Sequence, residues 1–260
     1  MARLPGSLGA TRLVRCDGVD AIGERAAAYV AALSAASTGR FAIALSGGRT
    51  PRHLYSRLAE PPFSGLVPWA MSHVFWTDER CVPPDHPNSN YGMARETLLA
   101  RLPAPPAGIH RMRGEIDPDH AASEYEATMR RLCCAPLARW PKLDLVILGI
   151  GEDGHTASIF PGSEETDGDR WVVAPFVEKL GARRLSMTLG VINHAEAVVV
   201  LASGASKAHV VRSLLHPRTP PRWPAEKIRP LNGRLTLFVD EEACAGIEDE
   251  SRERDTPEEG

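Results

Sequence analysis

The sequence predicts an α/β protein that is built on a mainly parallel sheet. Short, almost wholly apolar runs recur along its 260 residues, and segments with helical spacing lie between them. Runs of this kind are typical of strands buried on both faces, as in parallel sheets that helices cover on each side. Hydrophobic residues make up 43% of the chain, which is enough apolar surface for a sizeable core.

Predicted strands and helices alternate along the chain. After a first strand over 11–15, strands are predicted at the apolar runs 41–45, 73–77, 143–148, 197–202 and 235–239. Helices are predicted over 19–36, 51–59, 90–101, 118–137 and 207–215. The proline-rich segments 61–68, 103–106 and 217–224 are predicted as loops. We expect one catalytic domain over 1–247 and a disordered acidic tail over 248–260.

Composition narrows the classes of partner. The formal net charge of −3 does not favour a nucleic-acid or membrane partner, because both need a basic face. No apolar run approaches the ~20 residues of a membrane span, and the first residues lack the apolar core of a secretory signal. The five cysteines include no C-x-x-C pair, which favours reduced thiols. We therefore expect a cytoplasmic protein, a monomer or weak homodimer, whose partner is a small molecule.

The first candidate binding loop, S-G-G-R-T-P over 46–51, joins a predicted strand to a predicted helix. Its paired glycines let backbone N–H groups approach an anion, and the helix N-terminus adds about half a unit of positive charge. The G-x-x-x-x-G-K-[ST] spacing of nucleotide P-loops is absent. The segment predicts phosphate binding through Ser46, Gly47, Gly48 and Thr50, and the alternative is a plain strand-to-helix turn.

The second candidate is the charged triplet Asp78-Glu79-Arg80 at the end of the strand predicted over 73–77. Open α/β sheets bind ligands beyond the carboxyl ends of their strands, so we expect Asp78 and Arg80 to face that crevice. The planar fork of an arginine matches two oxygens of a phosphate or carboxylate. The alternative is a surface ion pair of Arg80 with Asp78 or Glu79.

The third candidate, G-I-G-E-D-G-H-T-A-S-I-F-P-G over 149–162, follows the strand predicted over 143–148. Read as G-x-G-x-x-G it suggests a dinucleotide site, but Pro161-Gly162 comes too soon for the crossover helix of that motif. His155 is a general-base candidate, and Asp153 lies two residues before it. A zinc site and a serine hydrolase centred on Ser46 find no supporting spacing, so we expect no metal and no cofactor.

The fourth candidate is G-A-S-K-A over 204–208, which follows the strand predicted over 197–202. Lys207 in a first helical turn opposes the helix dipole, and a bound phosphate resolves that conflict. The alternative is a lysine that extends into solvent. Upstream, Arg183 and Arg184 add positive charge, and we expect one of them, taken as Arg184, to reach the same crevice.

Together these segments, with R-R-L-S-M-T-L over 183–189, resemble the motif series of the 6-phosphogluconolactonase family over roughly residues 41–240. The D-E-R triplet and D-G-H-T-A-S-x-F-P-G are the most specific elements. The resemblance implies a Rossmann-like three-layer α/β/α sandwich, as in glucosamine-6-phosphate deaminases and ribose-5-phosphate isomerases. It also implies hydrolysis of 6-phospho-D-glucono-1,5-lactone to 6-phospho-D-gluconate in the oxidative pentose phosphate pathway.

Two alternatives to a lactonase stay open. The related deaminases resemble D-E-Y and D-G-H-I-A-F-N-E-P where this chain has D-E-R and D-G-H-T-A-S-I-F-P, and a non-catalytic phosphosugar-binding regulator would lack the base. The chain departs from the lactonase pattern at Arg49, often serine or threonine, and at Gly190, where proline is common. We expect His155 to be the base and Asp153 to orient it, while Arg80, Lys207, Arg184 and the glycine loop hold the phosphate.

Overall fold

The computed structural model describes residues 11–37, 39–134, 138–162, 168–231 and 233–247. Seven strands of this part form one sheet, and every neighbouring pair in it is parallel. Their order across the sheet is β1 (Arg12–Cys16), β11 (Arg234–Asp240), β10 (Ala197–Ala202), β6 (Leu145–Gly149), β2 (Phe41–Leu45), β3 (Ser72–Trp76) and β5 (Gly108–Ile109). The predicted mainly parallel sheet is confirmed.

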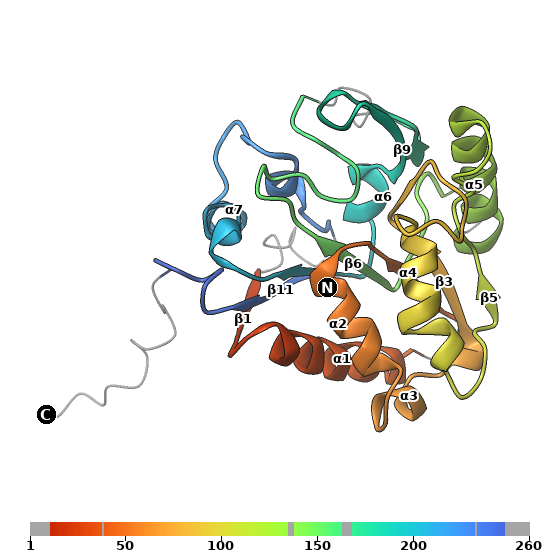
Figure 1. Ribbon diagram of the computed structural model, residues 1–260, viewed down its shortest axis with the longest axis horizontal. Helices are drawn as coiled ribbons and strands as arrows, with labels where there is room; N and C mark the ends of the chain where they lie inside the picture. The colour runs from red at the N-terminus through yellow and green to blue at the C-terminus, as the bar shows by residue number, and fades with distance from the viewer. Residues whose placement is uncertain (1–10, 38, 135–137, 163–167, 232, 248–260) are drawn as a thin grey trace, which may run out of the picture.

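Helices cover both faces of this sheet (Figure 1). The α-helices are α1 (Val19–Ala35), α2 (Arg49–Leu58), α3 (Phe63–Leu66), α4 (Asn90–Thr97), α5 (Pro118–Cys133), α6 (Leu189–Asn193) and α7 (Ala208–Leu215). Figure 1 shows α1, α2 and α3 below the sheet and α5, α6 and α7 above it. The molecule is therefore the three-layer α/β/α sandwich that the resemblance implied.

The central strands are buried on both faces, which explains their near-continuous apolar sequences. In β2, Ala42 and Ala44 belong to one hydrophobic cluster, and Phe41, Ile43 and Leu45 belong to the other. The strands β6 and β10 divide their side chains between the same two clusters in the same alternating way. Alternation of side chains along a strand therefore supplies two cores from one apolar run.

Element boundaries shift by a few residues from the predicted ones. The helix predicted over 51–59 begins at Arg49, because Gly48, with φ 113°, turns the chain directly from the β2 loop into the helix. The stretches predicted as helical over 90–101 and 207–215 each divide into an α-helix and a 3₁₀ turn, Leu99–Arg101 and Ala205–Lys207. The helix predicted over 118–137 ends at Cys133, and 135–137 lie outside the described residues, as does the tail over 248–260.

A second, antiparallel sheet was not predicted. It joins β4 (Asp78–Arg80), β9 (Ala182–Met187) and β7 (Val172–Val173), and β8 (Phe176–Val177) also pairs with β9. Strands of two or three residues are too short to show a periodicity. This sheet sets Arg80 opposite Arg184 in register, and so brings the D-E-R triplet beside a segment about a hundred residues away.

Gly190, one of the two departures from the lactonase pattern, packs against the side chain of Trp140. It is the second residue of α6, and a Cβ added there would lie 2.2 Å from the Trp140 ring. That ring stacks on His194 with the centroids 5.0 Å apart, so it cannot swing aside freely. The indole thus fills the space that a larger residue at position 190 would need.

In the part of the chain that is described, no helix combines the length and apolar character of a membrane span.

Candidate active site

The loops that follow β2, β3, β6 and β10 line one cleft of about 210 Å³ at the carboxyl ends of these strands. Because these strands are neighbours in a parallel sheet, their following loops emerge at the same edge. The structure places eight of the ten predicted site residues in its lining: Ser46, Gly47, Gly48, Thr50, Asp78, Arg80, His155 and Lys207. Asp153 and Arg184 do not line this cleft, and they contact or approach residues that do.

The glycine loop is held by groups around it. The Tyr55 hydroxyl accepts from the Ser46 N–H at 2.9 Å and donates to the Ser46 carbonyl at 2.7 Å, which fixes the start of the loop. A Cβ at Gly47 would lie 1.8 Å from Oδ1 of Asn90. Within the described residues, no hydrogen bond uses the N–H groups of Gly48, Arg49 and Thr50 at the start of α2. The loop therefore presents several donors toward the cleft.

Glu79, the central residue of the triplet, connects β4 to the start of α4 through hydrogen bonds. Its carboxylate accepts from the N–H groups of Asn90 and Tyr91 at 2.7 and 2.8 Å, and from the Ser89 hydroxyl at 3.1 Å, at the start of α4. Burial raises the pKa of Glu79 and outweighs the opposing effect of these bonds. Glu79 therefore holds the segment 78–90 together and does not pair with the Arg80 guanidinium.

Asp78 and Arg80 lie on either side of Glu79 and line the cleft. The Asp78 carboxylate accepts from the Ser158 hydroxyl at 2.9 Å, which ties β4 to the loop that carries His155. Nη1 of Arg80 donates to the Asn88 carbonyl at 2.5 Å. No carboxylate in the described ranges lies within ion-pair distance of Arg80, so the surface ion pair that was the alternative reading does not form.

Positive charge gathers on this cleft. Arg49, Arg80 and Lys207 line it, and none of the three forms an ion pair within the part of the chain that is described. Burial lowers the pKa of Lys207, and the nearby carboxylates of Glu152 and Asp153 only partly offset this effect. Arg80 and Lys207 are partly buried cations without an ion-pair partner among the described residues, which is costly, and an anion in the cleft would offset that cost.

The two arginines of β9 point to different neighbours. The Arg183 guanidinium donates to both carboxylate oxygens of Asp119, at 2.7 and 2.9 Å. Arg184 lies opposite Arg80, and its pKa is lowered by burial and then by the charge of Arg80. Arg184 is thus the arginine beside Arg80, and it does not line the cleft.

The loop after β6 brings a carboxylate against the His155 ring. Oδ1 of Asp153 lies 2.5 Å from Nδ1 of His155, and Nζ of Lys179 donates to Oδ2 at 2.9 Å. Burial raises the pKa of Asp153, but the bonds from Lys179 and His155 outweigh it and hold the pKa well below its ordinary value. A Cβ at Gly151 would lie 2.0 Å from Nδ1 of His155, so only glycine leaves room for this pair.

The contact with Asp153 determines which ring nitrogen carries the proton. An ionised carboxylate only accepts hydrogen bonds, so Nδ1 of His155 is the protonated nitrogen and Nε2 is left as an acceptor. The ring also stacks on Phe160, with the centroids 4.3 Å apart. Asp153 at one edge of the imidazole and the Phe160 ring against its face thus orient the imidazole together.

Sequence reasoning missed several residues that hold these loops. Two oxygens of Asp240 accept from the Gly204 N–H at 3.0 Å, and the Ser203 hydroxyl donates to Oδ2 at 2.5 Å, which fixes the approach to Lys207. Asp240 ends β11, so the rule that favours polar residues at strand ends would have found it. Tyr55, Asn90 and Lys179 give no comparable signal, because only the tertiary fold brings them near the site.

Comparisons with known proteins agree with the geometry. Residues 18–237 match the family model described as "Glucosamine-6-phosphate isomerases/6-phosphogluconolactonase". The chain is 41% identical to a 6-phosphogluconolactonase of Synechocystis over 211 residues. The aligned residues cover 80% of this chain and 85% of the Synechocystis protein. The chain is 34% identical to a 6-phosphogluconolactonase of Haemophilus influenzae over 205 residues. The aligned residues cover 77% of this chain and 85% of the Haemophilus protein.

Solved structures share the fold of this chain. The 6-phosphogluconolactonase of Trypanosoma brucei superposes with a TM-score of 0.81 at 29% identity, over 93% of this chain and 100% of that one. A monomeric glucosamine-6-phosphate deaminase superposes with a TM-score of 0.77 at 21% identity, over 90% and 98% of the two chains, which shows the shared fold alone. The chain therefore belongs to the glucosamine-6-phosphate isomerase/6-phosphogluconolactonase family.

Proposed function

We propose that this chain is an enzyme that hydrolyses 6-phospho-D-glucono-1,5-lactone to 6-phospho-D-gluconate, the lactonase step of the oxidative pentose phosphate pathway. One observation carries the proposal: an imidazole oriented by an ionised carboxylate shares a cleft with unpaired cations and a glycine loop. The relatives that bear the 6-phosphogluconolactonase name, at up to 41% identity among those compared, support the same reaction.

The phosphate of the substrate binds at the cationic side of the cleft. The N–H groups of Gly48 and Thr50 donate to its oxygens, and Arg80 and Lys207 supply charge-assisted hydrogen bonds. Arg49, at the position that is often serine or threonine in the family, adds a third cation to the same cleft. Arg184 lies beside Arg80 and adds to the positive potential without direct contact.

The rest of the substrate lies toward the loop after β6. Asp78 offers only acceptor oxygens, so in the bound complex it accepts from a sugar hydroxyl rather than holding the phosphate. The Ser46 hydroxyl is buried and has no hydrogen-bond partner among the described residues, which leaves it available to the substrate. With the phosphate fixed at one end, the lactone carbonyl lies near the His155 ring.

Hydrolysis proceeds by general-base catalysis at His155. Nε2 removes a proton from a water molecule while the water oxygen forms a bond to the lactone carbonyl carbon, and the carbonyl π electrons move onto its oxygen. When the tetrahedral intermediate collapses, the bond from this carbon to the ring oxygen breaks, and the imidazolium returns the proton to the departing oxygen. Asp153 stabilises the imidazolium and keeps Nε2 directed at the water.

Two other readings of the site are less well supported. In a deaminase-like enzyme the triplet resembles D-E-Y, whereas Arg80 here lines the cleft as a cation. A non-catalytic phosphosugar-binding regulator would need the phosphate loop alone. The Asp153–His155 contact, supported by Gly151 and Lys179, has no use in such a protein.

The phosphate role of the cations can be tested by titration calorimetry with 6-phospho-D-gluconate. Arg80→Ala and Lys207→Ala each remove a charge-assisted hydrogen bond worth about 1.5–3 kcal/mol, so we expect affinity to fall roughly 10- to 100-fold. Arg95→Ala removes an exposed arginine of α4 that does not line the cleft, and should leave affinity unchanged. Equal affinity of wild type, Arg80→Ala and Lys207→Ala would exclude these residues from the phosphate site.

The reaction itself can be followed as loss of enzymatically generated lactone, with the uncatalysed rate subtracted. The wild-type chain should accelerate this loss and release no ammonia from glucosamine-6-phosphate. His155→Ala should lower kcat by about 10² to 10⁴ with product affinity largely retained, because only the base is removed. A kcat near that of the wild type in this variant would remove the histidine from the mechanism.

The orienting role of Asp153 has a matched control in its neighbour. In Asp153→Asn the amide can donate to Nδ1, which shifts the ring proton to Nε2, and we expect kcat to fall about 10²-fold or more while KM changes little. Glu152→Gln removes an adjacent charge that makes no contact with the His155 ring, so its kcat should stay within about twofold. Equal kcat values for the two variants would contradict the tautomer assignment.

A further inference from the structure

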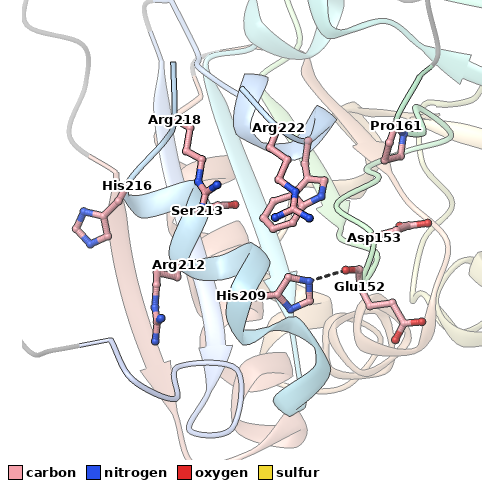
Figure 2. Close-up of a pocket in the computed structure, with 10 residues that line it drawn as sticks. Glu152, Asp153, Pro161, His209, Arg212, Ser213, His216, Arg218 and Arg222 are labelled. Carbon is pink, nitrogen blue, oxygen red and sulfur yellow. Dashed lines mark hydrogen bonds between the residues drawn. The ribbon is translucent and has the colours of Figure 1, made fainter. Parts of the chain in front are cut away.

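A second pocket lies beside the loop that carries His155, against α7. Its volume is about 740 Å³, and it is lined by Glu152 and Asp153 of this loop, by α7 and by the segment that follows α7. Among the residues that the structure describes, none lines both this pocket and the cleft. Figure 2 shows Arg222 between α7 and the loop, and Arg218 beside Ser213 of α7.

The pocket is rich in unneutralised positive charge. Arg218 and Arg222 have no carboxylate within ion-pair distance in the described ranges, and Arg212 donates to the Gly246 carbonyl at 2.9 Å. Two carboxylates also line the pocket. Asp153 is engaged by Lys179 and His155, and Figure 2 shows the Glu152 carboxylate directed away from both arginines. Arg218 and Arg222 are therefore available to pair with an anion in the pocket.

Flat side chains form one wall of this pocket. The guanidinium carbon of Arg222 lies 4.6 Å from the centroid of the Trp223 ring, and the His209 ring meets the same indole edge-on at 5.3 Å. A guanidinium stacked on an indole is a surface on which heteroaromatic rings stack readily. The apolar ring of Pro161 also lines the pocket, and Figure 2 shows it to the right of Arg222, on the same side as Asp153.

This wall is anchored to the catalytic loop and is therefore preformed. Nε2 of His209 lies 2.7 Å from the Glu152 carbonyl, and the Ala225 N–H donates to the Gly154 carbonyl at 3.0 Å. Gly154 has φ 77°, and a Cβ there would lie 2.3 Å from Cγ of Trp223, so the indole sits directly on the backbone of the loop. A preformed surface lowers the ordering cost of binding.

We propose that this pocket binds a nucleoside polyphosphate, with its phosphates against Arg218 and Arg222 and its base against the surface of Arg222, Trp223 and His209. The volume suits an organic anion rather than a bare phosphate, since sites for organic ligands span ~300–1,000 Å³. Each of the two arginines can form a bidentate pair with a phosphate group. This site is separate from the cleft and does not depend on lactone hydrolysis.

Calorimetric titration of the full chain with ATP and with inorganic pyrophosphate tests the proposal. ATP should bind the wild type more tightly than pyrophosphate does, and should bind Arg218→Ala/Arg222→Ala at least tenfold more weakly. The matched control is Arg95→Ala/Arg234→Ala, which removes two exposed arginines that do not line the pocket and should keep the wild-type affinity for ATP. Arg218→Ala alone, a change of one exposed side chain, should weaken ATP binding several-fold without disturbing the fold.

Five results would overturn the proposal. If ATP does not bind at millimolar concentration and low salt, the pocket does not bind nucleoside polyphosphates. Unchanged ATP affinity in the double variant of the pocket, or an equal loss in the control, would show binding elsewhere or attraction by net charge alone. Loss of ATP binding in Lys207→Ala would place the nucleotide in the cleft. Pyrophosphate affinity equal to that of ATP would show that the base is not recognised.

Discussion

The site depends on one constraint, the parallel order of the strands β10, β6, β2 and β3. Parallel neighbours end at the same edge of the sheet, so four loops that are far apart in sequence open into one cleft. Each loop brings a different group there: helix N–H donors after β2, Arg80 after β3, the imidazole after β6 and Lys207 after β10. None of these groups alone would specify a phosphorylated substrate.

Holding these groups in place requires buried polar contacts behind them. Tyr55 fixes the glycine loop, Glu79 holds the triplet against α4, and Asp240 fixes the turn before Lys207. Each is a buried carboxylate or hydroxyl that forms hydrogen bonds to backbone groups, and Glu79 and Asp240 also accept from a serine hydroxyl. These anchors help to hold a cleft that Arg49, Arg80 and Lys207 line without ion pairs among the described residues, and a bound phosphate offsets the cost of these unpaired cations.

The central sheet could be predicted well from the sequence, because its strands are marked by continuous apolar runs. β2 and β10 lie at the predicted residues, since strands buried on both faces are apolar throughout. The small antiparallel sheet was missed, because β4 and β9 are charged and β7 has only two residues. The site residues were found through their position after strands, which is why Lys207 and His155 were predicted and Lys179, on a 3₁₀ turn, was not.

A crystal structure of this chain with bound 6-phospho-D-gluconate would test most directly whether the cleft holds the phosphate and directs the reacting carbon to His155. We expect the phosphate oxygens within hydrogen-bond distance, about 2.7–3.2 Å, of Arg80, Lys207 and the Gly48 N–H, with the C1 carboxylate beside Nε2 of His155. A phosphate bound at Arg218 and Arg222 with the cleft empty, or a C1 carboxylate turned away from the imidazole, would contradict the account.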